Sequence, residues 1–213
     1  MKDNVFFVSG IDTNVGKSYV TGYLAKTWNE QGVRTITQKF IQTGNVGMSE
    51  DIELHRKIMG TGLLPEDESG LTMPEIFTYP CSPHLAAEID HRPIDFDKIE
   101  KTTRQLSETY DAVLLEGAGG LMVPLTRDLL TIDYVAQKNY PLIFVTSGKL
   151  GSINHTLLSL EAITRRGIRL HTVAYNLFPE EDDDIIRRDT EAYIRDLLAK
   201  EYPETHFVII PKL

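Results

Sequence analysis

Cysteine is almost absent from this sequence of 213 residues, in which Cys81 is the only one. A single thiol excludes a disulfide framework and any zinc module built on several cysteines. An excess of basic residues is also missing, because 22 lysines and arginines face 31 aspartates and glutamates, giving a net charge of −9. We therefore expect no nucleic-acid partner and no binding to an anionic membrane surface.

Long apolar runs are missing as well. No stretch approaches the ~18 consecutive apolar residues of a membrane-spanning helix. The first predicted strand begins at Val5, which leaves no room for a signal peptide before it. These absences predict a soluble protein of the cytoplasm, with no membrane among its partners.

Short apolar runs alternate with amphipathic stretches along the chain. The apolar runs, rich in β-branched residues, cover 5–8, 33–37, 112–115, 142–145, 170–174 and 207–210. Helical patterns cover 19–31, 51–59, 96–110, 131–138, 153–166 and 185–200. Short continuous apolar runs suit strands buried on both faces, and the alternation is typical of parallel crossover units. We therefore predict one α/β domain over 1–213, with a mainly parallel sheet and helices on both faces.

Glycine and proline cluster between Gly60 and Pro93, which predicts a long loop region with one short strand at 76–79. In open parallel sheets, ligands bind beyond the carboxyl ends of the strands. The residues that follow each predicted strand are therefore the candidates for function.

A phosphate-binding loop follows the first predicted strand. Its sequence, SGIDTNVGKS at 9–18, has the form G-x5-G-K-S, one residue longer than the common P-loop. Backbone amides at the start of the next helix would face a polyphosphate, Lys17 would neutralise its β- and γ-phosphates, and Ser18 would ligate Mg²⁺. The alternative is an ordinary glycine-rich turn, but the position between strand and helix favours a fold like that of P-loop NTPases. Asp12 stands where partition-type ATPases carry a second lysine.

Three charged residues lie at the ends of predicted strands or at the start of a predicted helix. Lys39 follows the second predicted strand, at whose carboxyl end it could hold a second anion or simply be solvated. Asp51 opens a helix and could be an N-cap or a Mg²⁺ ligand. Glu116 ends an apolar strand before Gly117-Ala-Gly-Gly120, an arrangement that places a carboxylate near nucleotide-bound Mg²⁺.

Two later strand ends carry weaker signals. The segment 146–155 leads into a helix with Ser152 as the expected N-cap, where free amides could bind a carboxylate or merely start a capped helix. Asn176 ends the fifth long strand, and its amide could pair with an adenine edge.

Together these strand ends resemble one family, the dethiobiotin synthetases. The matching segments are GIDTNVGKS at 10–18, KFIQTG at 39–44, Asp51, CSPH at 81–84, LEGAGG at 115–120 and KLGSINHTLL at 149–158. They occur in the family's order across nearly the whole chain. The P-loop alone is widespread, whereas EGAGG followed by KLGxINH is far more specific.

The resemblance implies an ATP-dependent ring closure in biotin synthesis. 7,8-Diaminononanoate and CO2 form a carbamate, whose oxygen takes the γ-phosphoryl group of ATP to give a carbamic–phosphoric anhydride. The second amine then attacks the carbonyl, which closes the cyclic urea and releases phosphate. A carbamate is a poor nucleophile in water, so catalysis must come from alignment and charge neutralisation.

The resemblance also implies a role for individual residues. Lys17, Lys39 and Thr13 would act on the reacting groups, and Ser18, Asp51 and Glu116 would hold Mg²⁺. Nucleotide contacts would come from Asp12, Asn14, Val15, Gly16, Lys17, Ser18, Tyr19, Glu116, Gly119 and Asn176. The substrate would be bound by Thr13, Lys39 and Thr43, and by Gly151, Ser152, Ile153 and Asn154 of the other subunit. A homodimer with the active site at its interface is therefore expected.

The sequence departs from the family pattern at several positions. Ile11 replaces a threonine, and Thr43 replaces a common serine. Phe40 replaces a proline, which we expect to relax the backbone around Lys39. Tyr193 is a candidate for a substrate-contacting tyrosine of the last long helix, but it is shifted along the sequence.

Three other hypotheses remain open at this point. One is a P-loop switch ATPase of the partition or metal-insertion type, against which the acidic charge and Asp12 argue. Another is an ATP-dependent amide-forming enzyme related to cobyrinate synthases, whose glutaminase domain has no counterpart here. The third is a paralogue that binds ATP without turnover, which Phe40 makes conceivable.

Overall fold

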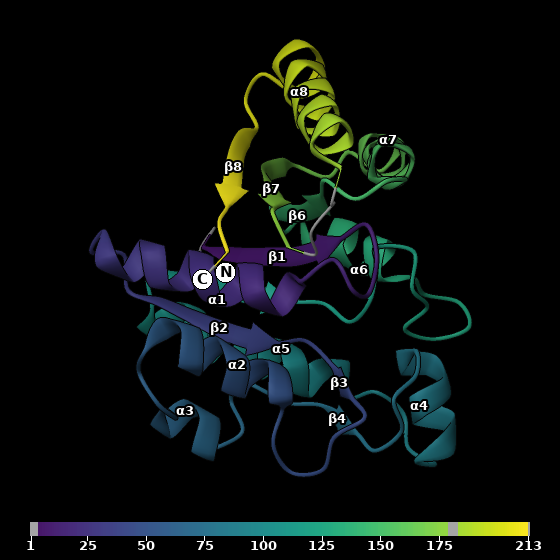
Figure 1. Cartoon of the computed structure of the whole chain (residues 1–213). Coiled ribbons are helices and arrows are strands. Elements are labelled where there is room, and N and C mark those ends of the chain that lie inside the picture. The colour runs from purple at the N-terminus through teal and green to yellow at the C-terminus, as the bar shows by residue number, and fades with distance from the viewer. Residues whose placement is uncertain (1–3, 179–182, 213) are drawn as a thin grey trace.

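Six parallel strands form the main sheet (Figure 1). The computed structural model describes residues 4–178 and 183–212. The strand order is β2-β5-β1-β6-β7-β8, and all neighbours are parallel. A second parallel pair joins β3 (Gln42–Thr43) to β4 (Ile76–Phe77). The predicted mainly parallel sheet is confirmed. The strands of the main sheet are β1 (Val5–Gly10), β2 (Thr35–Lys39), β5 (Ala112–Glu116), β6 (Leu142–Ser147), β7 (Leu170–Asn176) and β8 (His206–Ile210).

Helices cover both faces of this sheet, as predicted. Figure 1 shows α1 in front of the sheet and α5 behind it. Side chains alternate along each strand, so that Phe7 and Val113 pack into the core beneath α5 to α8, whereas Val8 and Leu114 pack beneath α1. The helices are α1 (Lys17–Glu30), α2 (Glu50–Met59), α3 (Pro65–Glu68), α4 (Pro83–Ile89), α5 (Phe96–Thr109), α6 (Thr131–Lys138), α7 (Ser152–Arg165) and α8 (Asp184–Glu201). Within the described residues, no helix is both long enough and apolar enough to cross a membrane.

The pairing of β2 with β5 positions two charged side chains. Their last residues, Lys39 and Glu116, lie opposite each other in the register. Thr37 shares the face of Lys39, since alternate residues of a strand point the same way. Gln38 points to the other face, where its amide contacts Thr103 of α5. Lys39 and Glu116 therefore face the side of the sheet that α1 and α2 cover.

One predicted strand lies later than expected. The sequence predicts a strand over 33–37, whereas β2 runs over Thr35–Lys39. Val33 is 38% exposed, and Arg34 forms a surface ion pair with Asp111, so neither joins the buried strand. Lys39 consequently ends the strand itself, with its backbone held by the sheet.

The region 60–93 is more regular than the predicted loop. It contains α3, β4 and α4, of which only β4 was predicted. Proline opens both helices, at Pro65 and Pro83, where a missing N–H leaves no hydrogen bond unmade. These helices have four and seven residues, too few for a clear apolar period. The prediction of an otherwise irregular loop is therefore wrong.

Candidate active site

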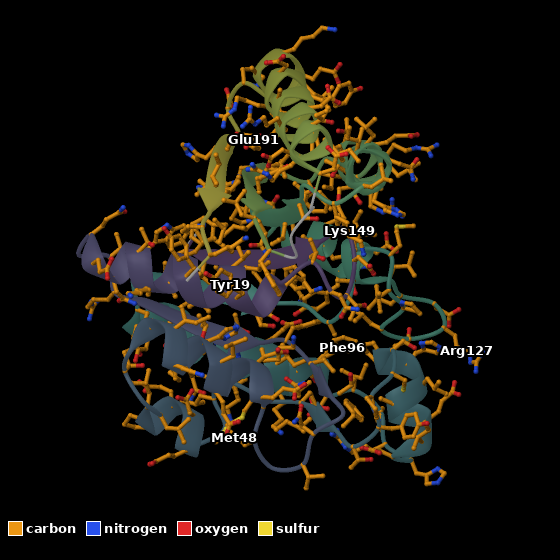
Figure 2. All side chains as sticks on the ribbon, viewed as in Figure 1. Tyr19, Met48, Phe96, Arg127, Lys149 and Glu191 are labelled. Carbon is orange, nitrogen blue, oxygen red and sulfur yellow. The ribbon has the colours of Figure 1, made fainter. Side chains whose placement is uncertain are left out.

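A cleft of about 870 Å³ lies at the carboxyl ends of β1, β2 and β5, and we call it the strand-end cleft. Its walls come from the phosphate loop (residues 10–18), from the segments after β2 and β5, and from the segment 80–83. Tyr19, labelled on α1 in Figure 2, also lines it. The lining includes Thr13, Asn14, Gly16, Lys17, Ser18, Tyr19, Lys39, Thr43, Asp51, Glu116 and Gly119. The structure thus brings together most of the site residues predicted from separate strand ends.

The phosphate loop has the backbone that its glycines predict. Gly16 has φ +84°, and a Cβ there would overlap Nδ2 of Asn176. Lys17 follows and folds back over the loop, donating hydrogen bonds to the carbonyls of Asp12 (2.8 Å) and Thr13 (3.2 Å). Burial lowers the pKa of Lys17 to about 8, although the charge of Glu116 opposes this shift. Both acceptors are neutral carbonyls, so phosphate oxygens can compete for this ammonium group.

A compact cluster of charge lies beside Lys17. Lys39 Nζ donates to Oε1 of Glu116 at 2.9 Å and forms an ion pair with Asp51. Burial by itself would lower the pKa of Lys39, but the carboxylates of Glu116 and Asp51 outweigh it and raise that pKa. Burial would likewise raise the pKa of Glu116, yet the charge of Lys39 and the hydrogen bonds from His55 and Lys39 hold it well below its usual range. Glu116 is therefore a fully buried carboxylate that stays ionised.

Three oxygen atoms in this cluster fit the ligand preference of Mg²⁺. Ser18 Oγ lies 2.6 Å from Oδ1 of Asp51 and 2.9 Å from Oε1 of Glu116. Within residues 4–178 and 183–212, no group of three or more histidine, cysteine, aspartate or glutamate side chains is arranged to hold a metal ion. Mg²⁺ at nucleotide sites needs only one or two carboxylates, since phosphate and water oxygens complete its coordination. The donor set of Ser18, Asp51 and Glu116 is therefore suited to a nucleotide-bound Mg²⁺.

Asp51 can contact this cluster because a different residue caps the N-terminus of helix α2. The sequence left open that Asp51 is an N-cap, but the N-cap of α2 is Ser49, whose Oγ accepts a hydrogen bond from Ile52 N at 3.2 Å. Asp51 is the second residue of the helix, two positions after the cap, so its carboxylate is available to Ser18 and Lys39. The expected N-cap at Ser152 is also wrong. Gly151 holds that position in α7 with φ +94°.

Two other residues behave differently from their sequence expectation. Phe40 does not relax the backbone: its N–H, which a proline would lack, donates to Glu116 O at 2.8 Å, and its ring is fully buried against Phe7. Asn176 is also fully buried, and its Nδ2 donates to Val15 O at 2.9 Å. In this structure Asn176 fastens the phosphate loop to the end of β7, and its contact with adenine stays a prediction.

The remaining predicted residues divide between the cleft and the surface. Thr13 and Gly119 come close across the cleft, since a Cβ on Gly119 would lie 3.7 Å from the Thr13 hydroxyl. The Tyr19 hydroxyl donates to Pro211 O at 2.8 Å, which ties α1 to the described end of the chain. By contrast, the described lining of the cleft includes none of the residues 151–154. Their loop follows β6, where Figure 2 labels Lys149.

Several residues that line the cleft or lie directly beneath it were missed by the sequence analysis. His55 is fully buried, with Nε2 2.7 Å from Oε2 of Glu116. The sequence feature that could have indicated His55 is its spacing of four residues from Asp51, which puts both side chains on one face of α2. Phe178 lines the cleft just after β7 and is 56% exposed. Pro80 and Cys81 also line it, although the CSPH segment served only as a family match.

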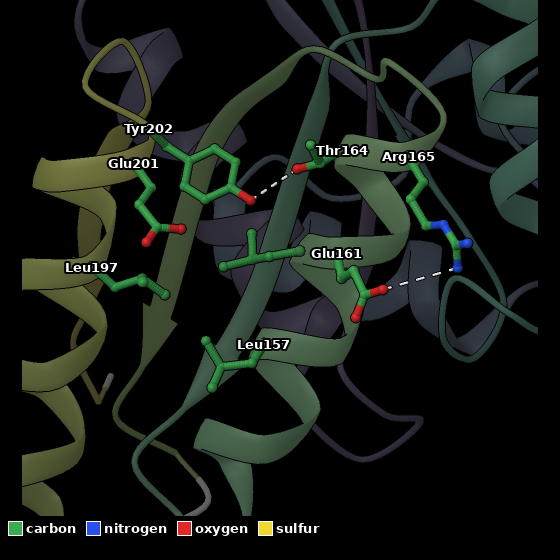
Figure 3. Close-up of a pocket in the computed structure, with 8 residues that line it drawn as sticks. Leu157, Glu161, Thr164, Arg165, Leu197, Glu201 and Tyr202 are labelled. Atoms are coloured by element: carbon green, nitrogen blue, oxygen red, sulfur yellow. Dashed lines mark hydrogen bonds and ion pairs between the residues drawn. The ribbon is translucent and has the colours of Figure 1, made fainter.

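A second hollow of about 290 Å³ lies between α7 and α8 (Figure 3). Leu157 and Leu197 line it from opposite helices. Two polar pairs lie in it: Thr164 and Tyr202 share a 2.8 Å hydrogen bond, and Glu161 and Arg165 form an exposed ion pair. Its described lining contains no buried charge, so the strand-end cleft is the candidate active site.

Relatives of this chain by sequence include ATP-dependent dethiobiotin synthetases. A family model described as an AAA domain matches residues 4–213. The ATP-dependent dethiobiotin synthetase BioD 2 of Pasteurella multocida (strain Pm70) is 52% identical over 206 residues, covering 97% of this chain and 96% of that protein. The ATP-dependent dethiobiotin synthetase BioD of Chlorobaculum tepidum is 53% identical over 191 residues, covering 90% of this chain and 80% of that protein.

Solved structures show the fold. The MinC:MinD cell division protein complex of Aquifex aeolicus matches with a TM-score of 0.56 at 14% identity, over 99% of this chain and 82% of that chain. The structure of pNOB8 ParA bound to nonspecific DNA matches with a TM-score of 0.57 at 13% identity, over 98% of this chain and 84% of that chain. At such identities the likeness is one of fold, and it confirms the predicted P-loop NTPase architecture. Because the sequence matches are about half identical over nearly its whole length, this chain belongs to the ATP-dependent dethiobiotin synthetase family.

Proposed function

We propose that this enzyme forms dethiobiotin in the strand-end cleft, with ATP on the phosphate loop and the diamine beside Lys39. The observation that carries the proposal is the convergence of Lys39, Asp51, Glu116 and Ser18 directly beside Lys17. An ordinary glycine-rich turn would not require two lysines and two carboxylates to converge at its end. We infer that residues 1–213 act as a single domain and that the protein works in the cytoplasm.

The reaction needs alignment and charge neutralisation more than proton transfer. One amine of 7,8-diaminononanoate adds to CO2 and loses a proton to give a carbamate. A carbamate oxygen attacks the γ-phosphorus of ATP, ADP leaves, and a carbamic–phosphoric anhydride forms. The second amine attacks the anhydride carbonyl, the C–O bond to phosphate breaks, and a proton is lost as the cyclic urea closes. The products are dethiobiotin, ADP and phosphate.

The two lysines would flank the γ-phosphoryl group as it is transferred. Lys17 would bind the β- and γ-phosphates and offset the charge that develops on the transferring oxygens. Lys39 would turn from its carboxylate partners toward the carbamate and the γ-phosphate. Thr13 and Thr43 would donate hydrogen bonds to the reacting end of the diamine, since both line the cleft.

Ser18, Asp51 and Glu116 would hold Mg²⁺. When bound, the ion would offset negative charge on the phosphates and so ease the departure of ADP. The protein's own contribution includes a buried, ionised carboxylate: burial opposes ionisation of Glu116, but its neighbours hold its pKa well below the usual range.

We also propose that the site is completed by a second copy of the chain. Gly151, Ser152, Ile153 and Asn154 form the start of α7, and no side chain caps that helix. Free amides at a helix start favour a carboxylate. These residues do not line the described cleft of their own subunit, so the diamine's carboxylate would reach the helix start of the partner.

Mixing two inactive variants tests both the site and its sharing. Lys17→Ala removes the phosphate-binding cation, and Asn154→Glu places a negative charge at the helix start that would receive the carboxylate. Each should be nearly inactive alone while remaining a dimer by light scattering. After the two are unfolded and refolded together, random pairing should restore roughly a quarter of the sites, because one site of each mixed dimer is intact.

Two results would oppose the proposal. A monomer at micromolar concentration would exclude a shared site. A mixture that stays inactive, although mass spectrometry detects mixed dimers, would place residue 154 and residue 17 in the same site of one subunit.

A further inference from the structure

His55 holds one oxygen of Glu116 from beneath the strand-end cleft. Its ring is fully buried on α2, and Nε2 lies 2.7 Å from Oε2 of Glu116. The other oxygen, Oε1, lies 2.9 Å from both Ser18 Oγ and Lys39 Nζ. The two oxygens of this carboxylate therefore have separate partners, one in the protein interior and one facing the cleft.

The imidazole is itself held on its other side. His55 Nδ1 lies 3.0 Å from Thr37 Oγ1, which also accepts a hydrogen bond from Arg56 Nη1 at 2.8 Å. Arg56 in turn donates twice to Asp67, at 2.8 Å from Nε and 2.8 Å from Nη2. His55, Arg56, Thr37 and Asp67 are each no more than 1% exposed. This series of buried hydrogen bonds links α3, α2 and β2 to the end of β5.

The chemistry of the donor groups determines the direction of each hydrogen bond in this series. A guanidinium group only donates, so Thr37 Oγ1 accepts from Arg56 and keeps its own proton to donate. That proton can go to Nδ1 of His55, which leaves the N–H of a neutral imidazole on Nε2, where it donates to Glu116. No protonation of the ring is needed for this arrangement.

We propose that His55 is a positioning residue that fixes the orientation of the Glu116 carboxylate, so that Oε1 is presented to the metal ion of the active site. The inference rests on the proposed role of Glu116 as a Mg²⁺ ligand. His55 is not a ligand itself, because both ring nitrogens have partners in the interior. Groups that orient metal ligands typically change metal affinity or activity by about 10–100-fold when they are removed.

The test measures metal binding directly. Mn²⁺ is titrated into the full-length protein with a non-hydrolysable ATP analogue and followed by electron paramagnetic resonance, in wild type, His55→Leu and His55→Gln. We expect His55→Leu to weaken Mn²⁺ binding about 10-fold or more. Glutamine can donate from nearly the same point as Nε2, so His55→Gln should recover most of the loss. His206→Gln, an exposed histidine on β8, is the matched control and should bind like wild type.

Kinetics supply a second readout. The Mg²⁺ concentration for half-maximal dethiobiotin formation should rise in His55→Leu in parallel with the loss of Mn²⁺ affinity. Should His55→Leu fail to fold, Thr37→Val removes the hydroxyl behind the ring and should shift both readouts in the same direction. His55→Leu or Thr37→Val with wild-type Mn²⁺ affinity would overturn the inference. A wild-type protein that binds no Mn²⁺ in the presence of the analogue would instead overturn the metal site itself, and the inference with it.

Discussion

Lys17 and Lys39 determine what the strand-end cleft can bind. Both are at least 95% buried, and both point toward the ends of β1, β2 and β5. Lys39 is already paired with Glu116 and Asp51, whereas Lys17 has only carbonyl partners among its hydrogen bonds. Of the two, Lys17 is therefore the cation that a phosphate can recruit without displacing a carboxylate.

Replacing Lys17 tests this assignment. Lys17→Ala should lower the turnover number at least ~100-fold, equivalent to a loss of about 2.7 kcal/mol of transition-state stabilisation. Lys57→Ala on the exposed side of α2 is the control and should leave turnover unchanged. Near-normal dethiobiotin formation by Lys17→Ala would remove this lysine from its assigned role.

The sequence predicted the cluster residues that end a strand or begin a helix. Ser18, Lys39, Asp51 and Glu116 could be chosen because parallel strands bring their carboxyl ends to one edge. His55 was not chosen, because its four-residue spacing from Asp51 does not by itself distinguish it from a core histidine. Only the folded sheet brings Glu116 to its Nε2. Phe40 was misjudged because its backbone hydrogen bond depends on the register of β2 against β5.

At the scale of elements, α2 connects the active site to the interior. It carries Asp51 toward the cleft, and His55 and Arg56 toward β2. Arg56 and Asp67 form a buried ion pair that joins α2 to α3. Burial would raise the pKa of Asp67, but hydrogen bonds from Arg56 and Thr72 outweigh it and lower the pKa below its usual range. This pair should therefore matter more to stability than any surface pair.

Asp67→Asn tests the pair. Removing one partner leaves a buried guanidinium group uncompensated, so we expect a loss of roughly 3–5 kcal/mol in the free energy of unfolding, measured with urea at neutral pH. The exposed pair Arg34–Asp111 is the matched control, and Asp111→Asn should cost at most about 1 kcal/mol. An equal, small effect of both substitutions would contradict the buried pair's role.

The difference in unfolding free energy between wild type and Asp67→Asn should depend on pH in a definite direction. Asp67 has a lowered pKa in the folded protein, so its contribution is fully present above its unfolded pKa of about 3.9 and is lost as the pH falls through the folded value. The stability gap between wild type and Asp67→Asn should therefore narrow below about pH 4.

Elements differed in how well the sequence predicted them. The six long helices and six main strands each have a clear apolar pattern and were found within a few residues of the predicted ranges. The short elements β3, α3 and α4 were missed, because two to seven residues carry no usable period. They nevertheless matter, since β3 and the segment before α4 form one wall of the cleft.

On the scale of the whole molecule, the fold gathers functional residues from distant parts of the sequence. The phosphate loop, β2, α2 and β5 meet at one edge of the sheet, and this meeting follows from parallel strands alone. The start of α7 lies outside that cleft. Only the family resemblance implied that it would serve the active site of the other subunit. The fold is shared with the MinD and ParA structures, so fold does not decide the reaction. The chemistry must be measured.

The most direct measurement is the stoichiometry of one reaction. Purified protein is mixed with MgATP, bicarbonate and 7,8-diaminononanoate, and dethiobiotin is quantified by mass spectrometry alongside phosphate release. We predict one dethiobiotin for each phosphate, and neither product above background without the diamine. Phosphate released without dethiobiotin would contradict the account and indicate a switch ATPase, whereas ATP binding with neither product would indicate a protein that binds nucleotide without turnover.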